Sequence, residues 1–175
     1  MSYPYFAATL PALQFDRAPA LTEGEFRARC REHLSPAHAA VVCALLEDGA
    51  SEHPYAAAWS NRETQVRNAV ARQRAAKIPG AVAAPWLRAH DGFAVFIQSG
   101  VAAAFQEADP MKRERALDLL RWNLAGDLAG FDTLSAEAVF AYAVRLGILL
   151  RRAKADAAKG RERLLALARA SGAST

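Results

Sequence analysis

The chain has little of what enzymes and secreted domains commonly depend on. Its 175 residues include only two cysteines, which excludes a disulfide framework and fits a reducing compartment. No G-x-S-x-G sequence and no glycine-rich phosphate loop occurs, and Gly80, Gly92 and Gly100 are isolated. The sequence therefore predicts a protein that is not an enzyme and that holds no cofactor.

Long apolar runs are also missing. The longest nearly uncharged stretch, Ala138–Leu150, contains Arg145 and is shorter than the roughly 20 residues that span a bilayer. The first residues, MSYPYFAATLPAL, have neither the basic start nor the long apolar centre of a signal peptide. We therefore expect a cytoplasmic protein without direct membrane insertion, which partner subunits could hold peripherally at the inner face of a membrane.

The composition favours helix. The chain is 53% hydrophobic and 23% charged, as in globular proteins, and much of the apolar fraction is alanine. Alanine, leucine, arginine and glutamate are strong helix formers. The sequence predicts an all-α fold, with residues 1–175 as a single compact domain of about six or seven helices and residues 171–175 as a disordered tail.

Capping signals place the first two confident helices. Thr22 and Glu25 have the spacing of a capping box, so a helix is expected from Thr22 to about Leu34. Ser35-Pro36 then supplies an N-cap and a proline at the first helical position, and a second helix should run to residues 48–49. Almost no linker separates these helices, which predicts a helical hairpin.

Three further helices follow. A long one is expected from Tyr55 to about Ala76, and the run of about 16 residues after residue 91 favours helix over strand because strands are usually shorter. Asp109 and the proline after it begin the next helix, which ends at Gly130. Ser135 caps the last helix, which is expected to continue to about residue 170.

Two stretches lack a clear helical period. Tyr3–Leu10 is short and aromatic and stops at Pro11, which predicts a short extended segment or an N-terminal arm laid across the helices. Residues 78–92 contain two prolines, so we expect a connector with at most one helical turn.

Four residues have the spacing of a zinc knuckle. Cys30, His33, His38 and Cys43 form a C-x2-H-x4-H-x4-C pattern of zinc-ligand types. Both cysteines lie within expected helices, however, and a cysteine in an apolar helix is ordinarily a small core residue. We therefore predict no metal site, and a small hydrolase or metal protein using Cys30, His33 and His53 is only a third hypothesis.

Arg145 is the only charge in the thirteen residues of Ala138–Leu150, so it should be partly buried. A buried guanidinium needs carboxylate or carbonyl partners, and Asp127 and Asp132 are the nearest acids in sequence. The prediction is a structural ion-pair network of these three residues that holds the last two helices in register. A partner-facing role for Arg145 is the alternative.

Several stretches together resemble a known family. They are SYPYFAATLPAL, EFRARCREHLSP, WSNRETQVRNAVARQRAAK and LRWNLAGDLAGFDTLSAEAVFAYAVRLGILLRRAKADAAKGRERL. They are similar to an uncharacterised bacterial family encoded with the genes of V/A-type rotary ATPases. That family is distantly similar to the ATPase C (d) subunit, a helical socket between the central stalk and the membrane rotor. The socket subunit is longer and has repeated helical units, whereas no repeat is evident here.

The resemblance implies a non-catalytic subunit or an assembly component of a V/A-type ATPase, with partners on the central stalk or rotor side. It makes the arginines of two basic segments, residues 62–77 and 145–163, candidates for contacts with other subunits, since arginine is favoured at interfaces. These candidates are Arg62, Arg67, Arg72, Arg151 and Arg152. The same basic segments leave a nucleic-acid-binding helical module as the alternative function, although nucleic acid is the less expected partner.

Overall fold

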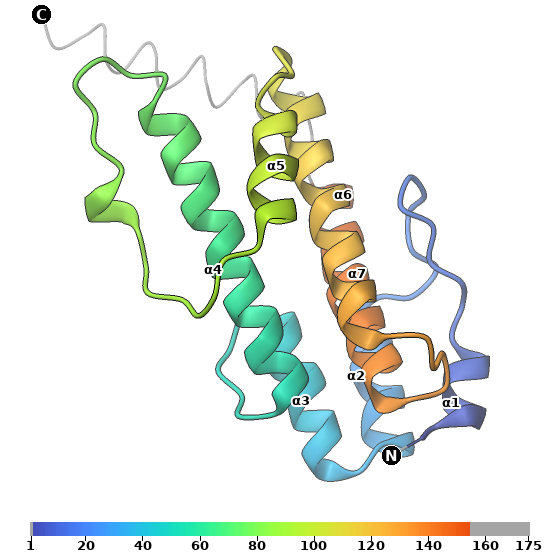
Figure 1. Ribbon diagram of the computed structural model, residues 1–175. Helices are drawn as coiled ribbons and strands as arrows, with labels where there is room; N and C mark the ends of the chain where they lie inside the picture. The colour runs from blue at the N-terminus through green and yellow to red at the C-terminus, as the bar shows by residue number, and fades with distance from the viewer. Residues whose placement is uncertain (1, 155–175) are drawn as a thin grey trace, which may run out of the picture.

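The computed structural model describes residues 2–154 of the chain. This part contains seven α-helices and no strand (Figure 1). The predicted all-α fold with six or seven helices is confirmed. The helices are α1 (Pro4–Thr9), α2 (Glu23–His33), α3 (Pro36–Leu46), α4 (Pro54–Ala75), α5 (Val95–Ala104), α6 (Pro110–Ala129) and α7 (Ala136–Lys154). The expected continuation of the last helix to residue 170 and the expected tail at 171–175 lie outside the described residues.

The predicted caps form. The Thr22 hydroxyl accepts a hydrogen bond from the Glu25 backbone N–H, and the Glu25 carboxylate accepts one from the Thr22 N–H, which completes a capping box. Ser35, Asp109 and Ser135 each accept a backbone N–H bond from the first turn of α3, α6 and α7. Local polar chemistry therefore fixes where these helices begin.

The N-terminal segment is helical, so the prediction of an extended segment over residues 3–10 is wrong for most of its length. Pro4 stands in the first turn of α1, where its fixed φ angle suits a helix, and Phe6 is 98% shielded from solvent in the core. Leu10, directly after the helix, is extended. Ser2 forms an isolated antiparallel bridge with Ser135, and the Tyr3 N–H donates to the Leu134 carbonyl over 2.7 Å.

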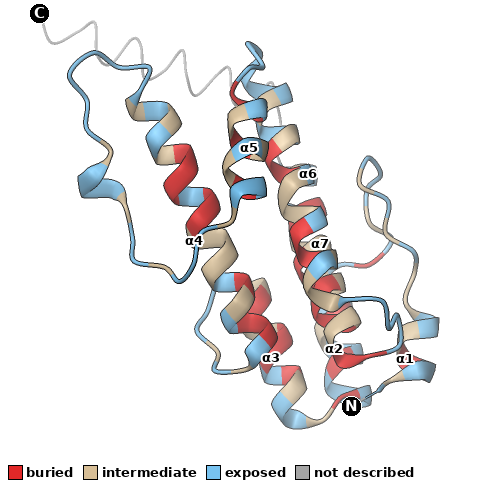
Figure 2. Cartoon of the chain, viewed as in Figure 1, coloured by how far each residue is buried: buried red, intermediate tan, exposed pale blue. Residues whose placement is uncertain are grey.

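The apolar α7 is central to the packing. It forms an antiparallel hairpin with α6 and packs along α3, and its residues Phe140, Ala143 and Leu146 are completely buried (Figures 1 and 2). Helix α5 fills the space between α4 and α6. A Cβ at Gly100 of α5 would lie 3.0 Å from Leu120 of α6, so the close approach of these two helices depends on glycine.

The connector of residues 76–94, between α4 and α5, is attached to the fold in an unusual way. None of its residues is buried (Figure 2). Its helical part is the 3-10 turn of Ala84–Trp86, which agrees with the expectation of at most one turn. It loops out from the end of α4 and returns alongside that helix (Figure 1). Burial of its own side chains therefore does not hold this segment.

Three amide side chains of α4 hold the connector instead. Asn61, Gln65 and Asn68 lie one helical turn apart and project from one face of the helix. Asn68 accepts from the Arg88 N–H over 3.0 Å and donates to the Arg88 carbonyl over 2.7 Å. Gln65 accepts from Ala94 and donates to Asp91, and Asn61 both accepts from and donates to Asp91. We call these three residues the amide ladder.

We expect Asn68→Ala to destabilise the protein by about 2–4 kcal/mol, because it removes two hydrogen bonds and leaves a main-chain donor and acceptor unpaired beside a buried position. Asn61→Ala is the matched control. Its hydrogen bonds are exposed, so water replaces them and the cost should be about 1 kcal/mol or less. Urea denaturation measures both. Equal costs for the two variants would contradict a dominant role for the buried part of the ladder.

Candidate functional site

The three candidate arginines of α4 face different sides of the helix. They are spaced five residues apart, which turns each by about 140° from the one before. Arg62 points inward, where its Nη1 donates to the Leu124 carbonyl over 3.1 Å and its guanidinium lies 5.9 Å from the Phe96 ring centre. Arg62 therefore joins α4 to α6 and α5 within the protein.

Of the other two candidate arginines of α4, Arg67 has partners within the chain and Arg72 does not among the described residues. Arg67 forms ion pairs with Glu63 over 2.9 Å and with Asp48 over 3.3 Å, so carboxylates of its own chain already partner it. Arg72 is exposed, and its side chain makes no hydrogen bond or ion pair with the described residues. Of these three arginines, Arg72 is the one placed to contact a partner without first breaking an internal pair.

A buried charge network ties α4, α6 and α7 together. Arg121 donates from Nε to Glu63 over 2.9 Å and lies 3.6 Å from Asp118, and Arg151 pairs with the same Asp118. Burial acts to lower the pKa of Arg121, but the charges of Glu63 and Asp118 outweigh it and raise that pKa above its usual value. Arg151, a predicted contact residue, is thus the outer end of an internal network.

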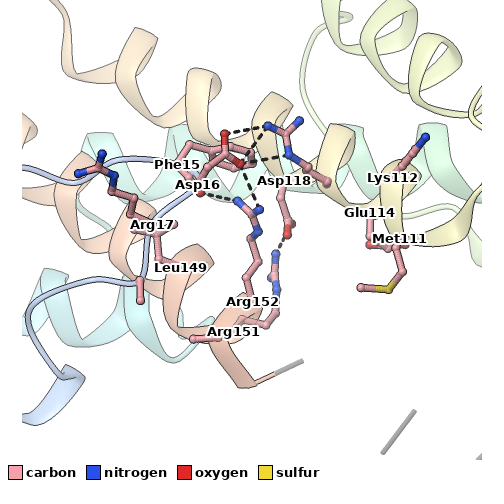
Figure 3. Close-up of a pocket in the computed structure, with 13 residues that line it drawn as sticks. Phe15, Asp16, Arg17, Met111, Lys112, Glu114, Asp118, Leu149, Arg151 and Arg152 are labelled. Carbon is pink, nitrogen blue, oxygen red and sulfur yellow. Dashed lines mark hydrogen bonds and ion pairs between the residues drawn. The ribbon is translucent and has the colours of Figure 1, made fainter. Parts of the chain in front are cut away.

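Arg152 is the last of the candidate arginines. It lies in a pocket of about 610 Å³ between the first turns of α6 and the last turns of α7 (Figure 3). Its Nη1 donates to the Phe15 carbonyl over 2.6 Å, and its guanidinium lies 4.1 Å from the Phe15 ring centre. Arg115 of α6 covers the same ring at 5.4 Å and binds Asp16 through both carboxylate oxygens. We call Phe15, Asp16, Arg115 and Arg152 the clamp.

The contacts of the clamp residues stabilise the fold at this pocket. Dashed lines in Figure 3 join Asp16 to Arg152 and Asp118 to Arg151, so these two guanidiniums are already bound by carboxylates. The hydrogen bonds from Arg115 hold the pKa of the Asp16 carboxyl below its ordinary value. The clamp therefore fixes the loop before α2 onto α6 and α7.

Arg145 reaches α6, but its partner is a carbonyl group. Its Nε donates to the Trp122 carbonyl over 3.1 Å, and its guanidinium lies 5.0 Å from the Trp122 ring centre. Among the described residues no ion pair joins Arg145 to Asp127 or Asp132, so the predicted ion-pair network takes a different form. Burial lowers the pKa of Arg145, which the charge of Asp127 opposes. Asp132 serves the turn before α7 and accepts from the Leu134 N–H.

The zinc-knuckle residues do not converge. In the described part of the chain, no group of three or more His, Cys, Asp or Glu side chains is placed to hold a metal ion. Cys30 is buried, which raises the pKa of its thiol to about 12. His33 stacks on Phe6, and His38 shares a 2.9 Å hydrogen bond with the Tyr3 hydroxyl.

An exposed apolar surface lies on the connector and the start of α5. Trp86 is 76% exposed, and five other large apolar side chains are exposed on the same segment. They are Ile78, Val82, Phe93, Val95 and Phe96. Sequence reasoning missed this surface because it treated residues 78–92 only as a linker. The signal was the presence of large apolar residues in a proline-containing segment that has no amphipathic period.

Residues 2–154 thus form an α-helical fold in which several arginines are paired internally and large apolar side chains are exposed on the connector and the start of α5. A protein-family model described as "Protein of unknown function (DUF2764)" matches residues 94–169, a range that includes α5, α6 and α7. No curated protein and no solved structure matches the chain. None of the described helices has the length and apolar character needed to cross a membrane.

The contact of Arg145 with α6 requires a glycine at position 126. A Cβ built on Gly126 would lie 2.1 Å from Arg145 Nη2, so Gly126→Ala must push the guanidinium away from Trp122. We expect a destabilisation of about 1–2 kcal/mol, from loss of a charge-assisted hydrogen bond. In an Arg145→Ala background the same change should stabilise the helix by up to about 1 kcal/mol, because alanine is the better helix former. Thermal denaturation of the four proteins measures this coupling, and equal effects in both backgrounds would contradict it.

The clamp predicts an acidic titration of Asp16. Its carboxyl should titrate below the ordinary value of 3.8, and Arg115→Met should move the pKa back toward 3.8. Because the folded-state pKa is lowered, the stabilisation is present above 3.8 and is lost as pH falls through the folded-state pKa. Carboxyl-detected NMR titration measures it, with the exposed, distant Arg29→Met as control. A wild-type midpoint at or above 3.8 would show that the clamp does not form.

Proposed function

We propose that this protein is a non-catalytic subunit or an assembly component of a V/A-type rotary ATPase complex, acting through protein contacts on the central stalk or rotor side. In this role it would lie in the cytoplasm, at the inner face of the membrane, held there by partner subunits. The similarity of four stretches of the sequence to the ATPase-associated family supports the choice of complex.

One observation supports a contact role most strongly. Ile78, Val82, Trp86 and Phe93 are exposed on the connector, and the amide ladder holds its second half, residues 88–94, against α4. Large apolar side chains gathered on a fixed surface mark sites of protein interaction, because water exposure of such a patch is unfavourable. An aromatic anchor such as Trp86 is also the residue type that contributes most at protein interfaces.

Nucleic-acid binding, the alternative, has less support from the geometry. Binding to phosphates needs basic side chains that are free to displace counterions. In the described part of the two basic segments, Arg67, Arg151 and Arg152 are paired with carboxylates, and Arg62 and Arg145 bind carbonyl groups.

Affinity purification of the tagged full-length chain from gently solubilised native membranes, followed by mass spectrometry, tests the proposal. We expect ATPase stalk or rotor subunits to accompany the wild-type protein, and the double variant Trp86→Ser, Phe93→Ser to lose them. Tyr5→Ser is the matched control, because Tyr5 is equally exposed but lies on α1, away from the connector.

Two results would contradict the proposal. One is recovery of no ATPase subunit by the wild-type protein while the complex is intact in the same extract. The other is recovery of nucleic acid with an affinity that falls steeply as salt increases, which is the signature of phosphate contacts.

A further inference from the structure

Two histidines meet where the N-terminal segment, α3, α4 and α7 come together. His38 lies in the first turn of α3, His53 is the N-cap residue of α4, and their ring centres are 5.5 Å apart. Both rings make edge-to-face contacts with Phe140 of α7, at 5.4 and 4.9 Å between ring centres. Tyr3, directly before α1, lies edge-on to His38 at 5.7 Å. We call His38 and His53 the histidine pair.

The hydrogen bonds of the histidine pair fit neutral rings. The Tyr55 N–H donates to His53 Nδ1 over 3.2 Å, so this nitrogen acts as an acceptor. The Tyr3 hydroxyl accepts a hydrogen bond from the Ser35 N–H. For its own proton, His38 Nδ1 at 2.9 Å is a nearer acceptor than the Ser35 hydroxyl at 3.4 Å. Both Nδ1 atoms are therefore acceptors, which an imidazole offers only when it is neutral.

A proton on either ring would change these contacts. On His53 Nδ1 it would face the Tyr55 N–H, donor against donor, and would place a positive charge at the positive end of the α4 dipole. On His38 Nδ1 it would leave the Tyr3 hydroxyl proton with only the longer contact to Ser35. Two charged rings 5.5 Å apart would also repel each other.

The charged groups around His38 favour its neutral form. Besides Tyr3 and His53, the α-amino group of the chain and Glu137 of α7 act on it. Burial and the charge of His53 lower the pKa of His38, and the α-amino group acts in the same direction. Glu137 raises this pKa and so opposes the other causes only in part.

The N-terminal segment is the least firmly held of the elements that meet at the histidine pair. Helix α1 has a single buried residue, Phe6, whereas α3, α4 and α7 each bury four or more. Elements with few buried apolar contacts open at the lowest free energy. A change in the contacts of the histidine pair should therefore move the N-terminal segment before it moves the other three helices.

We propose that the histidine pair is an acid-sensitive contact, which holds residues 2–9 against α3 while both rings are neutral and loosens this segment when the rings are protonated. The main bundle stays folded in both states. Loosening the segment would uncover Phe6, which is 2% exposed, and would add an apolar surface in acid. This inference does not depend on the proposed role in an ATPase.

NMR relaxation of the full-length protein tests the proposal. Between about pH 7.5 and about pH 5, the heteronuclear NOE of the backbone amides of residues 5–9 should fall in the wild type, which reports new motion on the ps–ns timescale. The double variant His38→Asn, His53→Asn should show no such fall. The amide oxygen of asparagine can take the place of Nδ1, and asparagine is a preferred N-cap, so this variant keeps the acceptors and removes the titration.

His33→Phe separates the histidine pair from a third histidine. His33 stacks on Phe6 with 5.3 Å between ring centres, so its titration is the alternative cause of an acid effect on α1. Phenylalanine keeps a ring at this place, and the variant should retain the fall seen in the wild type. Loss of the fall in His33→Phe, its persistence in the double variant, or its absence in the wild type would each overturn the proposal.

Coupling between the two rings gives a second measurement. The ring signals of His38 should titrate below the ordinary value of 6.5, and His53→Asn should move the midpoint up toward 6.5. Because the folded-state pKa is lowered, the stabilisation from neutral His38 is complete above 6.5 and is lost as pH falls from 6.5 toward the folded-state pKa. Urea denaturation should show a larger loss of stability in acid for the wild type than for the double variant. Equal losses, or a His38 midpoint that His53→Asn leaves unchanged, would also overturn the proposal.

Discussion

Six hydrogen bonds from Asn61, Gln65 and Asn68 hold residues 88–94, the second half of the connector, against α4. No residue of the connector is buried and Ala94 packs only partly against the core, so these hydrogen bonds matter more than apolar packing for its position. Because two of the three amides are buried, their hydrogen bonds exclude water and impose one arrangement. Helix α4 thus has two functions in the fold. It contributes Val66, Ala69 and Val70 to the core, and it holds residues 88–94 of the connector through the amide ladder.

The arginines near the core share a second feature. Each guanidinium binds an acceptor on another element, either a carboxylate or a main-chain carbonyl group. Arg121 lies between Glu63 and Asp118, Arg145 reaches the Trp122 carbonyl, and Arg152 reaches the Phe15 carbonyl. These contacts join helices that are distant in sequence. In the described residues, many of the arginines therefore stabilise contacts within the fold, whereas the side chain of Arg72 makes no hydrogen bond or ion pair there.

Local signals in the sequence predicted much of the fold. The capping box at Thr22, the serine before Pro36 and the aspartate before Pro110 are contacts between near neighbours, so their spacing is sufficient to place helix starts. The helix of Pro4–Thr9 was not predicted, because burial of Phe6 by distant helices decides it. The acceptors of Arg62 and Arg145 are main-chain carbonyl groups. Every residue has such a group, so the sequence does not indicate which one accepts the hydrogen bond. The five-residue spacing of Arg62, Arg67 and Arg72 did contain the information that they diverge, and the spacing of Asn61, Gln65 and Asn68 contained the information that they share a face.

The amide ladder contacts the connector only through main-chain atoms of Arg88, Asp91 and Ala94. Every residue type except proline offers the same N–H and carbonyl groups, so these six hydrogen bonds do not depend on which side chains stand at positions 88, 91 and 94. The side chains of Arg88, Asp91 and Ala94 can therefore be exchanged without loss of these hydrogen bonds. The recognition properties of this face can diverge among related proteins while the helical scaffold and its attachment to the connector stay the same, which separates the evolution of specificity from the maintenance of the fold.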